Sequence, residues 1–281
     1  MTTIAVIGMG EMGAGIAQRL IENGGRVVST LEDRSRETIE RAKAAGVEEM
    51  AAAQMADEAD IILSIVPPAV APETSRQFLP LIAKSVRKPT FIDGNAIAPQ
   101  TFAKMAEEYR GFGLKIGDAS IIGLPPKEGY TPRIYMSGDV QAETDTLTAL
   151  GMEIRLISDH GGDASAVKMA YAGITKGFQA VGLSMMLGAK RAGAAEAFLA
   201  ELEDTQPQFY AWFQKMLPVV CRKAYRWDDE MREIAKFLEP EQGAADMLNG
   251  AADLYRHVAQ DNAQGPQSEI VSSVQAFLDR K

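Results

Sequence analysis

The chain has very few of the side chains that form disulfides or bind transition metals. Its 281 residues include one cysteine, Cys221, and two histidines. One cysteine excludes intrachain disulfides and is typical of a reducing compartment, so we expect a cytoplasmic protein. Zinc sites are built largely from cysteine and histidine, and this composition argues against one.

Long apolar runs and an excess of positive charge are also lacking. No apolar run in the sequence reaches the roughly 18–20 residues that a membrane-spanning helix needs. The 29 lysines and arginines face 38 aspartates and glutamates, which gives a formal charge of −9. Such a chain is repelled by nucleic acid and by anionic membrane surfaces. We therefore expect neither as a partner, and expect a small-molecule substrate instead.

What the chain does have is an alternation of short apolar runs and helical patterns over its first 160 residues. β-branched runs of four to seven residues suit strands covered on both faces, and apolar residues three to four positions apart suit the helices between them. The predicted strands are 3–7, 26–31, 61–66, 90–93, 115–121, 133–137 and 153–157, and helices are predicted at 35–45, 99–109 and 140–150. This order predicts an α/β fold with a Rossmann-type doubly wound sheet.

The pattern changes after residue 160. From Ala164 to Lys190 no proline intervenes and apolar residues recur at helical spacing, which predicts one long helix. The rest of the chain is rich in Ala, Glu, Leu and Met and has no convincing strand. We expect an NAD(P)-binding domain over 1–160 and an all-helical substrate and dimerisation domain over 161–281, joined by the long helix.

A glycine-rich segment follows the first predicted strand and opens a helix. In this context Gly8 makes a tight turn, Gly10 lets the backbone approach a pyrophosphate, and Gly13 lets helix and strand pack closely. The helix N-terminus adds N–H groups for the phosphates. A purely structural turn is the alternative. The predicted cofactor-binding residues of this segment are Gly8, Met9, Gly10, Glu11, Met12 and Gly13.

The end of the second predicted strand bears on the choice between the two nicotinamide cofactors. An acidic residue there binds the ribose 2′-hydroxyl of NAD, whereas arginine and serine suit the 2′-phosphate of NADP. The segment 32–36 contains both kinds of residue. Arg34 and Ser35 favour NADP, with NAD as the alternative. In the competing interpretation Ser35 is a plain N-cap and Arg34 is solvated.

The order and spacing of five motifs resemble those of the β-hydroxyacid dehydrogenase family, which includes 3-hydroxyisobutyrate and 6-phosphogluconate dehydrogenases. The chain is most similar to a branch labelled 6-phosphogluconate dehydrogenase-like, whose members carry a small C-terminal helical domain. The five motifs are GMGEMG at 8–13, Ser64-Ile65-Val66-Pro67-Pro68, Asp93-Gly94-Asn95 with Pro99, the segment that begins Asp118-Ala119, and Gly161-Gly162 with Lys168.

The resemblance implies hydride transfer between NAD(P) and a hydroxyl-bearing carbon, with Lys168 as general base in oxidation or general acid in reduction. A lysine among apolar neighbours loses hydration, which lowers its pKa and makes proton transfer practicable. The resemblance also implies that Val66, Pro67 and Asn95 contact the cofactor. Asn95 is expected to approach Lys168 from the sheet side as a second catalytic residue.

Three positions depart from the family pattern. Ala172 stands where the family has an asparagine four residues after the lysine, and Ile122 stands where it has a substrate-binding serine. Thr175 replaces the glutamate that serves decarboxylation in 6-phosphogluconate dehydrogenases. Together with Gly123 these are the predicted substrate-binding positions. They favour a substrate less polar than a simple hydroxy acid, with an aromatic or bulky group as one option.

The helical half raises two further expectations. The aromatic residues Phe209, Tyr210, Trp212 and Phe213 favour packing in a core or a subunit interface over a pocket for a bulky substrate. The long helix is rich in small residues and is followed by only a modest helical domain. Relatives of this kind pack this region between subunits, so we expect a homodimer.

Three functions stay open. The first is an NADP-dependent alcohol dehydrogenase or carbonyl reductase. The second is imine reduction, known among relatives that usually replace the lysine, so that Lys168 counts against it. The third is an NADP-binding sensor without catalysis, which Ala172 and Ile122 favour and which Lys168 and Asn95 oppose.

Overall fold

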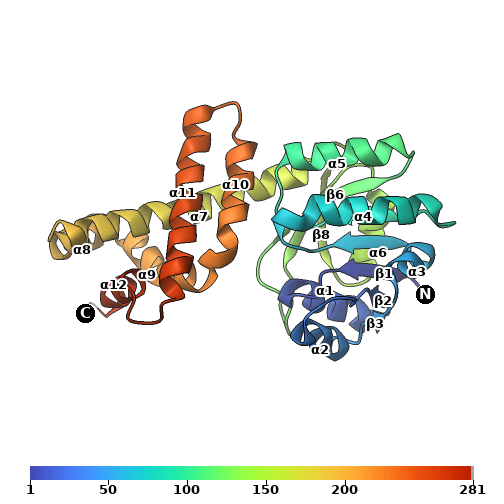
Figure 1. The fold of residues 1–281 in the computed structure, drawn as a ribbon, viewed down its shortest axis with the longest axis horizontal. Coiled ribbons are helices and arrows are strands. Elements are labelled where there is room, and N and C mark those ends of the chain that lie inside the picture. The colour runs from blue at the N-terminus through green and yellow to red at the C-terminus, as the bar shows by residue number, and fades with distance from the viewer. Residues whose placement is uncertain (280–281) are drawn as a thin grey trace. The chain divides into compact units, whose positions relative to one another are not determined.

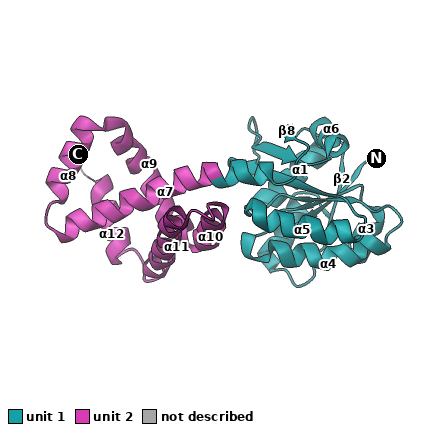
Figure 2. Cartoon of the chain, turned by 90° about the horizontal axis from the view of Figure 1, so that it is seen from above, with its two compact units in different colours: residues 1–169 teal, residues 170–281 magenta. Residues whose placement is uncertain are grey.

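The computed structural model describes residues 1–279 and divides the chain into two compact units. Unit 1 is Met1–Met169 and unit 2 begins at Ala170 (Figure 2). The division falls inside the long helix α7. The bounds of this helix, Asp163–Arg191, are close to the predicted 164–190. The fold class predicted from the sequence, a doubly wound sheet followed by an all-helical region, is confirmed.

Unit 1 is built on a single eight-stranded sheet of order β3-β2-β1-β4-β5-β6-β7-β8 (Figure 1). Neighbouring strands are parallel except β6 and β7, which are antiparallel. The run from β3 to β6 has the strand order of nucleotide-binding α/β folds. The strands are β1 (Thr3–Ile7), β2 (Arg26–Ser29), β3 (Glu48–Glu49), β4 (Ile61–Ser64), β5 (Thr90–Asp93), β6 (Ile116–Ile122), β7 (Arg133–Ser137) and β8 (Glu153–Ser158).

Two apolar cores lie on the two faces of this sheet. Successive strand residues point to opposite faces, so Ile4 and Val6 of β1 join one core while Ala5 and Ile7 join the other. Helices α1 and α2 lie on one side of the sheet and α4 and α5 on the other (Figure 1). The helices of unit 1 are α1 (Glu11–Glu22), α2 (Arg36–Ala44), α3 (Ala52–Glu58), α4 (Ala71–Lys84), α5 (Pro99–Gly111) and α6 (Gln141–Ala149).

Most strand and helix positions agree with the sequence pattern, and the differences have physical causes. The strands β2 and β4 end two residues earlier than predicted, where the chain turns into the loops at the edge of the sheet. The short strand β3 and the helices α3 and α4 were not predicted. The two residues of β3 are exposed glutamates, and α4 contains Pro80, a residue that normally interrupts a helix.

Unit 2 contains no strand among its described residues. After the last 22 residues of α7, it consists of α8 (Ala195–Thr205), α9 (Pro207–Lys223), α10 (Trp227–Phe237), α11 (Gln242–Asn262) and α12 (Glu269–Leu278). A Cβ atom at Gly182 would lie 2.2 Å from the Phe213 ring, so glycine allows this ring to lie directly on α7. Lys176 of α7 and Glu230 of α10 form a largely buried ion pair, with the Lys176 ammonium 5.5 Å from the Trp227 ring centroid.

The aromatic residues at 209–213 are divided between core and surface. Tyr210 is buried and packs edge-on against Phe277. Phe209 is half exposed and stacks on Phe178 of α7, which also contacts Trp212. Tyr210 therefore packs in the core, as predicted, while Phe209 contributes to the surface.

Candidate functional site

The glycine-rich loop leaves β1 and begins α1, and its three glycines have different surroundings. Gly8 has a φ of 96°, and a Cβ atom there would lie 2.2 Å from the Ile65 carbonyl oxygen. A Cβ atom at Gly13 would lie 1.9 Å from the Gly8 carbonyl oxygen. No atom lies within 4 Å of the corresponding position at Gly10, and no side chain caps α1. Gly8 and Gly13 are thus needed for packing, while the space beside Gly10, at the N-terminus of α1, is open.

The residues that follow β2 differ in the contacts that they make. Ser35 caps α2: its Oγ accepts a hydrogen bond from Thr38 N at 3.3 Å. Arg36 is paired with Glu40 at 2.7 Å. Arg34 is exposed and forms no ion pair among residues 1–279. The hydroxyl of Ser35 therefore has the N-cap role, and the predicted NADP preference depends mainly on Arg34.

Arg41 was not among the predicted site residues but supports the glycine-rich loop. Its Nη1 donates to the Met9 carbonyl oxygen at 3.1 Å, and its Nη2 pairs with Glu37. This contact ties α2 to the loop across 32 positions of sequence. No motif identifies such a residue, because the contact depends on how α2 packs beside the loop.

Asn95 fixes the loop that follows β4. Its Oδ1 accepts from Val66 N at 2.6 Å, and its Nδ2 donates to Ser64 Oγ at 3.2 Å and to Asp93 Oδ2 at 2.6 Å. The side chain is buried. The structure thus joins two predicted cofactor residues, Asn95 and Val66, next to Pro67. The direct role of Asn95 in catalysis stays a prediction, since these contacts show a positioning role.

Asp118 of β6 is the centre of a buried hydrogen-bond network. Its Oδ2 accepts from Gly162 N at 3.0 Å, from Ser165 N at 2.9 Å and from Ser137 Oγ at 2.9 Å. Its Oδ1 accepts from Ser165 Oγ at 2.6 Å. Ser137 Oγ in turn accepts from Ala164 N at 3.0 Å. Two side chains of the sheet therefore satisfy the N–H groups that begin α7.

This network combines a desolvated charge with several donors. Burial raises the pKa of the Asp118 carboxyl above its ordinary value, while the hydrogen bonds from Ser165, Ser137 and Gly162 act in the opposite direction. Four donors directed at the two oxygens suit an ionised carboxylate. The arrangement attaches the start of α7 to β6 and β7 by hydrogen bonds.

Lys168 lies in the second turn of the helix that Asp118 holds. Its Nζ donates to the Ile121 carbonyl oxygen at 2.7 Å, near the end of β6, and its side chain is half buried. Because β1, β4, β5 and β6 are mutually parallel, their carboxyl ends lie along one edge of the sheet. The glycine-rich loop, Val66, Asn95 and the Lys168 ammonium all lie at this edge, which is where open α/β sheets bind ligands.

The predicted substrate-binding residues on α7 offer no free polar group. Ala172 is buried. The Thr175 hydroxyl donates back to the helix, to the Tyr171 carbonyl at 3.0 Å and the Ala172 carbonyl at 3.4 Å. In unit 1, Ile122 ends β6 and Gly123 follows with a φ of 139°. Thus three of the four positions lack a hydrogen-bonding side chain, and the fourth, Thr175, uses its hydroxyl within the helix.

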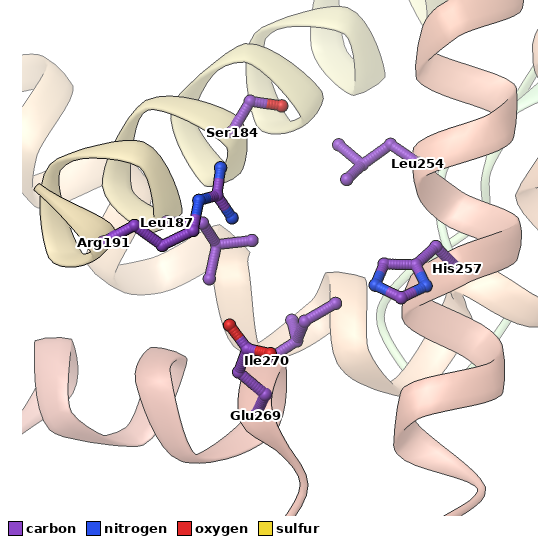
Figure 3. Close-up of a pocket in the computed structure, with 7 residues that line it drawn as sticks. All are labelled: Ser184, Leu187, Arg191, Leu254, His257, Glu269 and Ile270. Atoms are coloured by element: carbon purple, nitrogen blue, oxygen red, sulfur yellow. The ribbon is translucent and has the colours of Figure 1, made fainter.

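Unit 2 has a cavity of its own, of about 170 Å³ (Figure 3). Side chains from α7, α11 and α12 converge on it, among them Arg191, His257 and Glu269. None of the sequence-predicted site residues lines it. The remaining lining residues are Ser184, Leu187, Leu254 and Ile270.

Two further features of the described residues bear on cofactors and membranes. No group of three or more His, Cys, Asp and Glu side chains within residues 1–279 is arranged to hold a metal ion. In the same range, no helix has the length and the apolar character that crossing a bilayer requires.

Two family models match the chain. The model described as "NADP oxidoreductase coenzyme F420-dependent" matches residues 3–96, which include the glycine-rich loop and Asn95. A domain of unknown function, DUF1932, matches residues 189–258 in unit 2. The two matches fall in different units.

Individual relatives extend over more of the chain. The 3-hydroxyisobutyrate dehydrogenase of Pseudomonas aeruginosa is 29% identical over 205 residues, which are 70% of this chain and 63% of that enzyme. An uncharacterised 28.5 kDa protein of Methanothermus fervidus is 25% identical over 91% of this chain and 98% of its own length. The chain thus spans less than two thirds of the Pseudomonas enzyme.

Among solved structures, a conserved protein of unknown function described as structurally similar to 3-hydroxyacid dehydrogenases is 30% identical to this chain. The match covers 92% of this chain and 99% of that one, with a TM-score of 0.69. The chain therefore belongs to the β-hydroxyacid dehydrogenase-like family with a C-terminal helical domain, as its motifs predicted. This membership supports a dinucleotide-dependent oxidoreductase.

Replacing Asp118 tests whether its network holds the start of α7. Asp118→Asn keeps the size of the side chain but replaces one acceptor oxygen with an NH2 group, which then faces either the Ser165 hydroxyl or the N–H groups of Gly162 and Ser165. We expect the free energy of unfolding to fall by about 2–4 kcal/mol, measured by urea denaturation. Asp139→Asn, at an exposed position after β7, is the matched control and should change it by less than about 0.5 kcal/mol. Equal stabilities of the two variants would contradict the account.

Proposed function

We propose that the protein is an NADP-dependent oxidoreductase that transfers hydride between the nicotinamide and an alcohol or carbonyl carbon, with Lys168 as the proton-transfer group. The observation that carries the proposal is the placement of the Lys168 ammonium at the sheet edge that also holds the glycine-rich loop. A general acid or base must lie within hydrogen-bonding reach of the reacting oxygen.

The residues of unit 1 fit a bound dinucleotide in separate roles. The open space at Gly10 and the uncapped N-terminus of α1 receive the pyrophosphate, and Val66, held by Asn95, lies beside the cofactor. The nicotinamide supplies or accepts the hydride when it is bound. In reduction, Lys168 Nζ gives a proton to the substrate oxygen as negative charge develops there. In oxidation, the neutral amine takes that proton from the hydroxyl.

The substrate in this proposal is a small molecule with little charge near the reacting carbon. Ile122 and Ala172 cannot hydrogen-bond a carboxylate, and the Thr175 hydroxyl is engaged with the helix backbone. Buried polar groups of a substrate need partners, so these positions disfavour a simple hydroxy acid. Decarboxylation of 6-phosphogluconate is also disfavoured, because Thr175 replaces the acid that this reaction uses in the family.

Replacing Lys168 separates catalysis from cofactor binding. With Lys168→Ala, we expect kcat for carbonyl reduction to fall by about 100-fold or more, because the developing alkoxide loses its proton donor. The Kd for NADPH, measured by fluorescence titration, should stay within about twofold because the pyrophosphate loop is untouched. Lys104→Ala, at an exposed position on α5, is the matched control and should leave both quantities unchanged.

The same experiment decides among the three functions. Turnover that survives Lys168→Ala would exclude this lysine as the proton-transfer group. NADPH binding by the wild-type protein, without turnover of any alcohol, carbonyl or imine, would favour a sensor. Reduction of imines but not of carbonyls would favour the imine reductase alternative.

Arg34 and its neighbour Arg36 form a matched pair for testing the cofactor preference. Arg34→Ala should raise the Kd for NADPH about tenfold and leave the Kd for NADH unchanged, because the charge-assisted bond to the 2′-phosphate is lost. Arg36→Ala, which removes a side chain already paired with Glu40, should change neither Kd by more than about twofold. Equal losses for NADPH and NADH in Arg34→Ala would refute a role in 2′-phosphate recognition.

The proposed enzyme is a homodimer that forms through unit 2. A line of apolar side chains, exposed by between 46% and 63%, follows one face of α7: Tyr171, Ile174, Phe178, Val181 and Met185. We call this line the α7 stripe. Phe209 of α9 extends it by stacking on Phe178. Contiguous exposed apolar surface of this kind marks interaction sites, and a second copy of the chain offers the same surface.

Size-exclusion chromatography with light scattering tests the dimer. The wild-type protein should have twice the mass of one chain at micromolar concentration, and Val181→Lys should shift it to the mass of one chain because a buried lysine is costly. Met247→Lys changes an exposed apolar residue outside the α7 stripe and should leave the dimer intact. A wild-type monomer, or a dimer in Val181→Lys, would contradict this assignment.

A further inference from the structure

The loop that follows β6 carries a hydroxyl group at the predicted substrate-binding segment. Tyr130 lies in the connection from β6 to β7, and its Oη accepts a hydrogen bond from Leu124 N at 3.2 Å. A Cβ atom at Gly123 would lie only 2.2 Å from this oxygen. The phenol oxygen therefore lies directly against Gly123, one residue beyond Ile122.

This position is fixed by contacts that tie the loop to the rest of unit 1. Lys127 and Tyr130 exchange two backbone hydrogen bonds, of 3.0 and 2.9 Å, which form a tight turn. Arg19 of α1 donates from Nη2 to Thr131 Oγ1 at 2.8 Å. The loop also packs on α1 at Gly15, where a Cβ atom would lie 3.0 Å from Pro126 Cδ. The helix that begins at the glycine-rich loop therefore also supports the segment that carries Tyr130.

The O–H group of Tyr130 can still donate a hydrogen bond. Its oxygen accepts from Leu124 N, and within the described chain its O–H has no acceptor at hydrogen-bonding distance. The backbone of the same short segment binds the Lys168 ammonium at Ile121. At the carboxyl end of β6, residues 121–124 thus contact both the Lys168 ammonium and the Tyr130 hydroxyl. Ile122 itself has no donor to offer.

We propose that Tyr130 is a specificity-determining residue that contacts the substrate. Its O–H donates to a second oxygen of the substrate, apart from the one that Lys168 protonates. This donor selects carbonyl compounds that carry a neutral acceptor, such as an ether or hydroxyl oxygen, over plain alkyl analogues. The inference rests on the proposed carbonyl reduction and adds the class of substrate to it.

Two ketones of nearly equal size test the selection. Methoxyacetone and 2-pentanone differ by an ether oxygen in place of a methylene group. We expect Tyr130→Phe to lower the ratio of kcat/KM for methoxyacetone to kcat/KM for 2-pentanone about tenfold, mainly through KM for methoxyacetone. The value for 2-pentanone should stay within about twofold. Comparing the ratio between wild type and variant cancels the intrinsic reactivity of each ketone.

A control variant, the Kd and Tm of Tyr130→Phe and a second variant separate substrate contact from loop support. Tyr225→Phe, at an exposed tyrosine of unit 2, is the matched control and should leave the ratio unchanged. The Kd for NADPH and the Tm of Tyr130→Phe should stay close to those of the wild type, because Leu124 is exposed and water can replace the acceptor that its N–H loses. Gly123→Ala should reduce the same ratio, because its methyl group would occupy the position of the phenol oxygen.

Each outcome has a defined meaning. If Tyr130→Phe lowers kcat/KM equally for both ketones, Tyr130 only supports the loop and the proposal is overturned. An unchanged kcat/KM for both ketones would overturn it as well. If either ketone binds without turnover, inhibition constants against a carbonyl that is reduced give the ratio of the two affinities, which Tyr130→Phe should lower in the same direction. NADPH binding by the wild type without reduction of any carbonyl would instead refute the proposed function, before Tyr130 is considered.

Discussion

The contact between the Asp118 carboxylate and the first turn of α7 is the constraint on which the candidate site depends. A 29-residue helix begins directly after the last strand of unit 1, and its first N–H groups are met by Asp118 and Ser137 of the sheet. The first turn of the helix is therefore attached to the sheet by hydrogen bonds. Lys168 lies close enough to that start for its ammonium to reach the end of β6.

At this edge of the sheet, some residues hold the loops in position and another leaves the space beside it open. Gly8, Gly13, Asn95 and Arg41 shape or support the loops, and their contacts lie within the protein. The space beside Gly10 is open. Fixed loops around an open space are the preorganisation that hydride and proton transfer require, because the reacting groups then need little reorganisation.

The sequence predicted the parts of this arrangement that depend on local pattern. Apolar runs located the strands, and the glycine spacing located the loop after β1, because each follows from residues close in the chain. Lys168 was identified through a family motif. The Asp118 network could not be derived in this way. Its partners lie 19 to 47 positions from Asp118 in the sequence, and the contacts depend on how the start of α7 packs on the sheet. Tyr130 and Arg41 escaped prediction for the same reason.

Two polar residues make contacts that local sequence does not reveal. Asn95 is predicted to approach Lys168 from the sheet side; its amide holds Val66 and the end of β4, and its role in catalysis stays a prediction. Ser35 is predicted to bind a 2′-phosphate or to cap a helix, and its hydroxyl caps α2. In both cases a polar residue at the edge of the sheet satisfies the backbone first, which local sequence cannot distinguish from binding a ligand.

The most direct test of the central claim is isotope transfer. NADPH carrying two deuterium atoms at C4 of the nicotinamide would be incubated with the wild-type protein and a panel of aldehydes and ketones, and the alcohols analysed by mass spectrometry. The account predicts one deuterium on the carbinol carbon of the product. Binding of NADPH without deuterium in any product would contradict it.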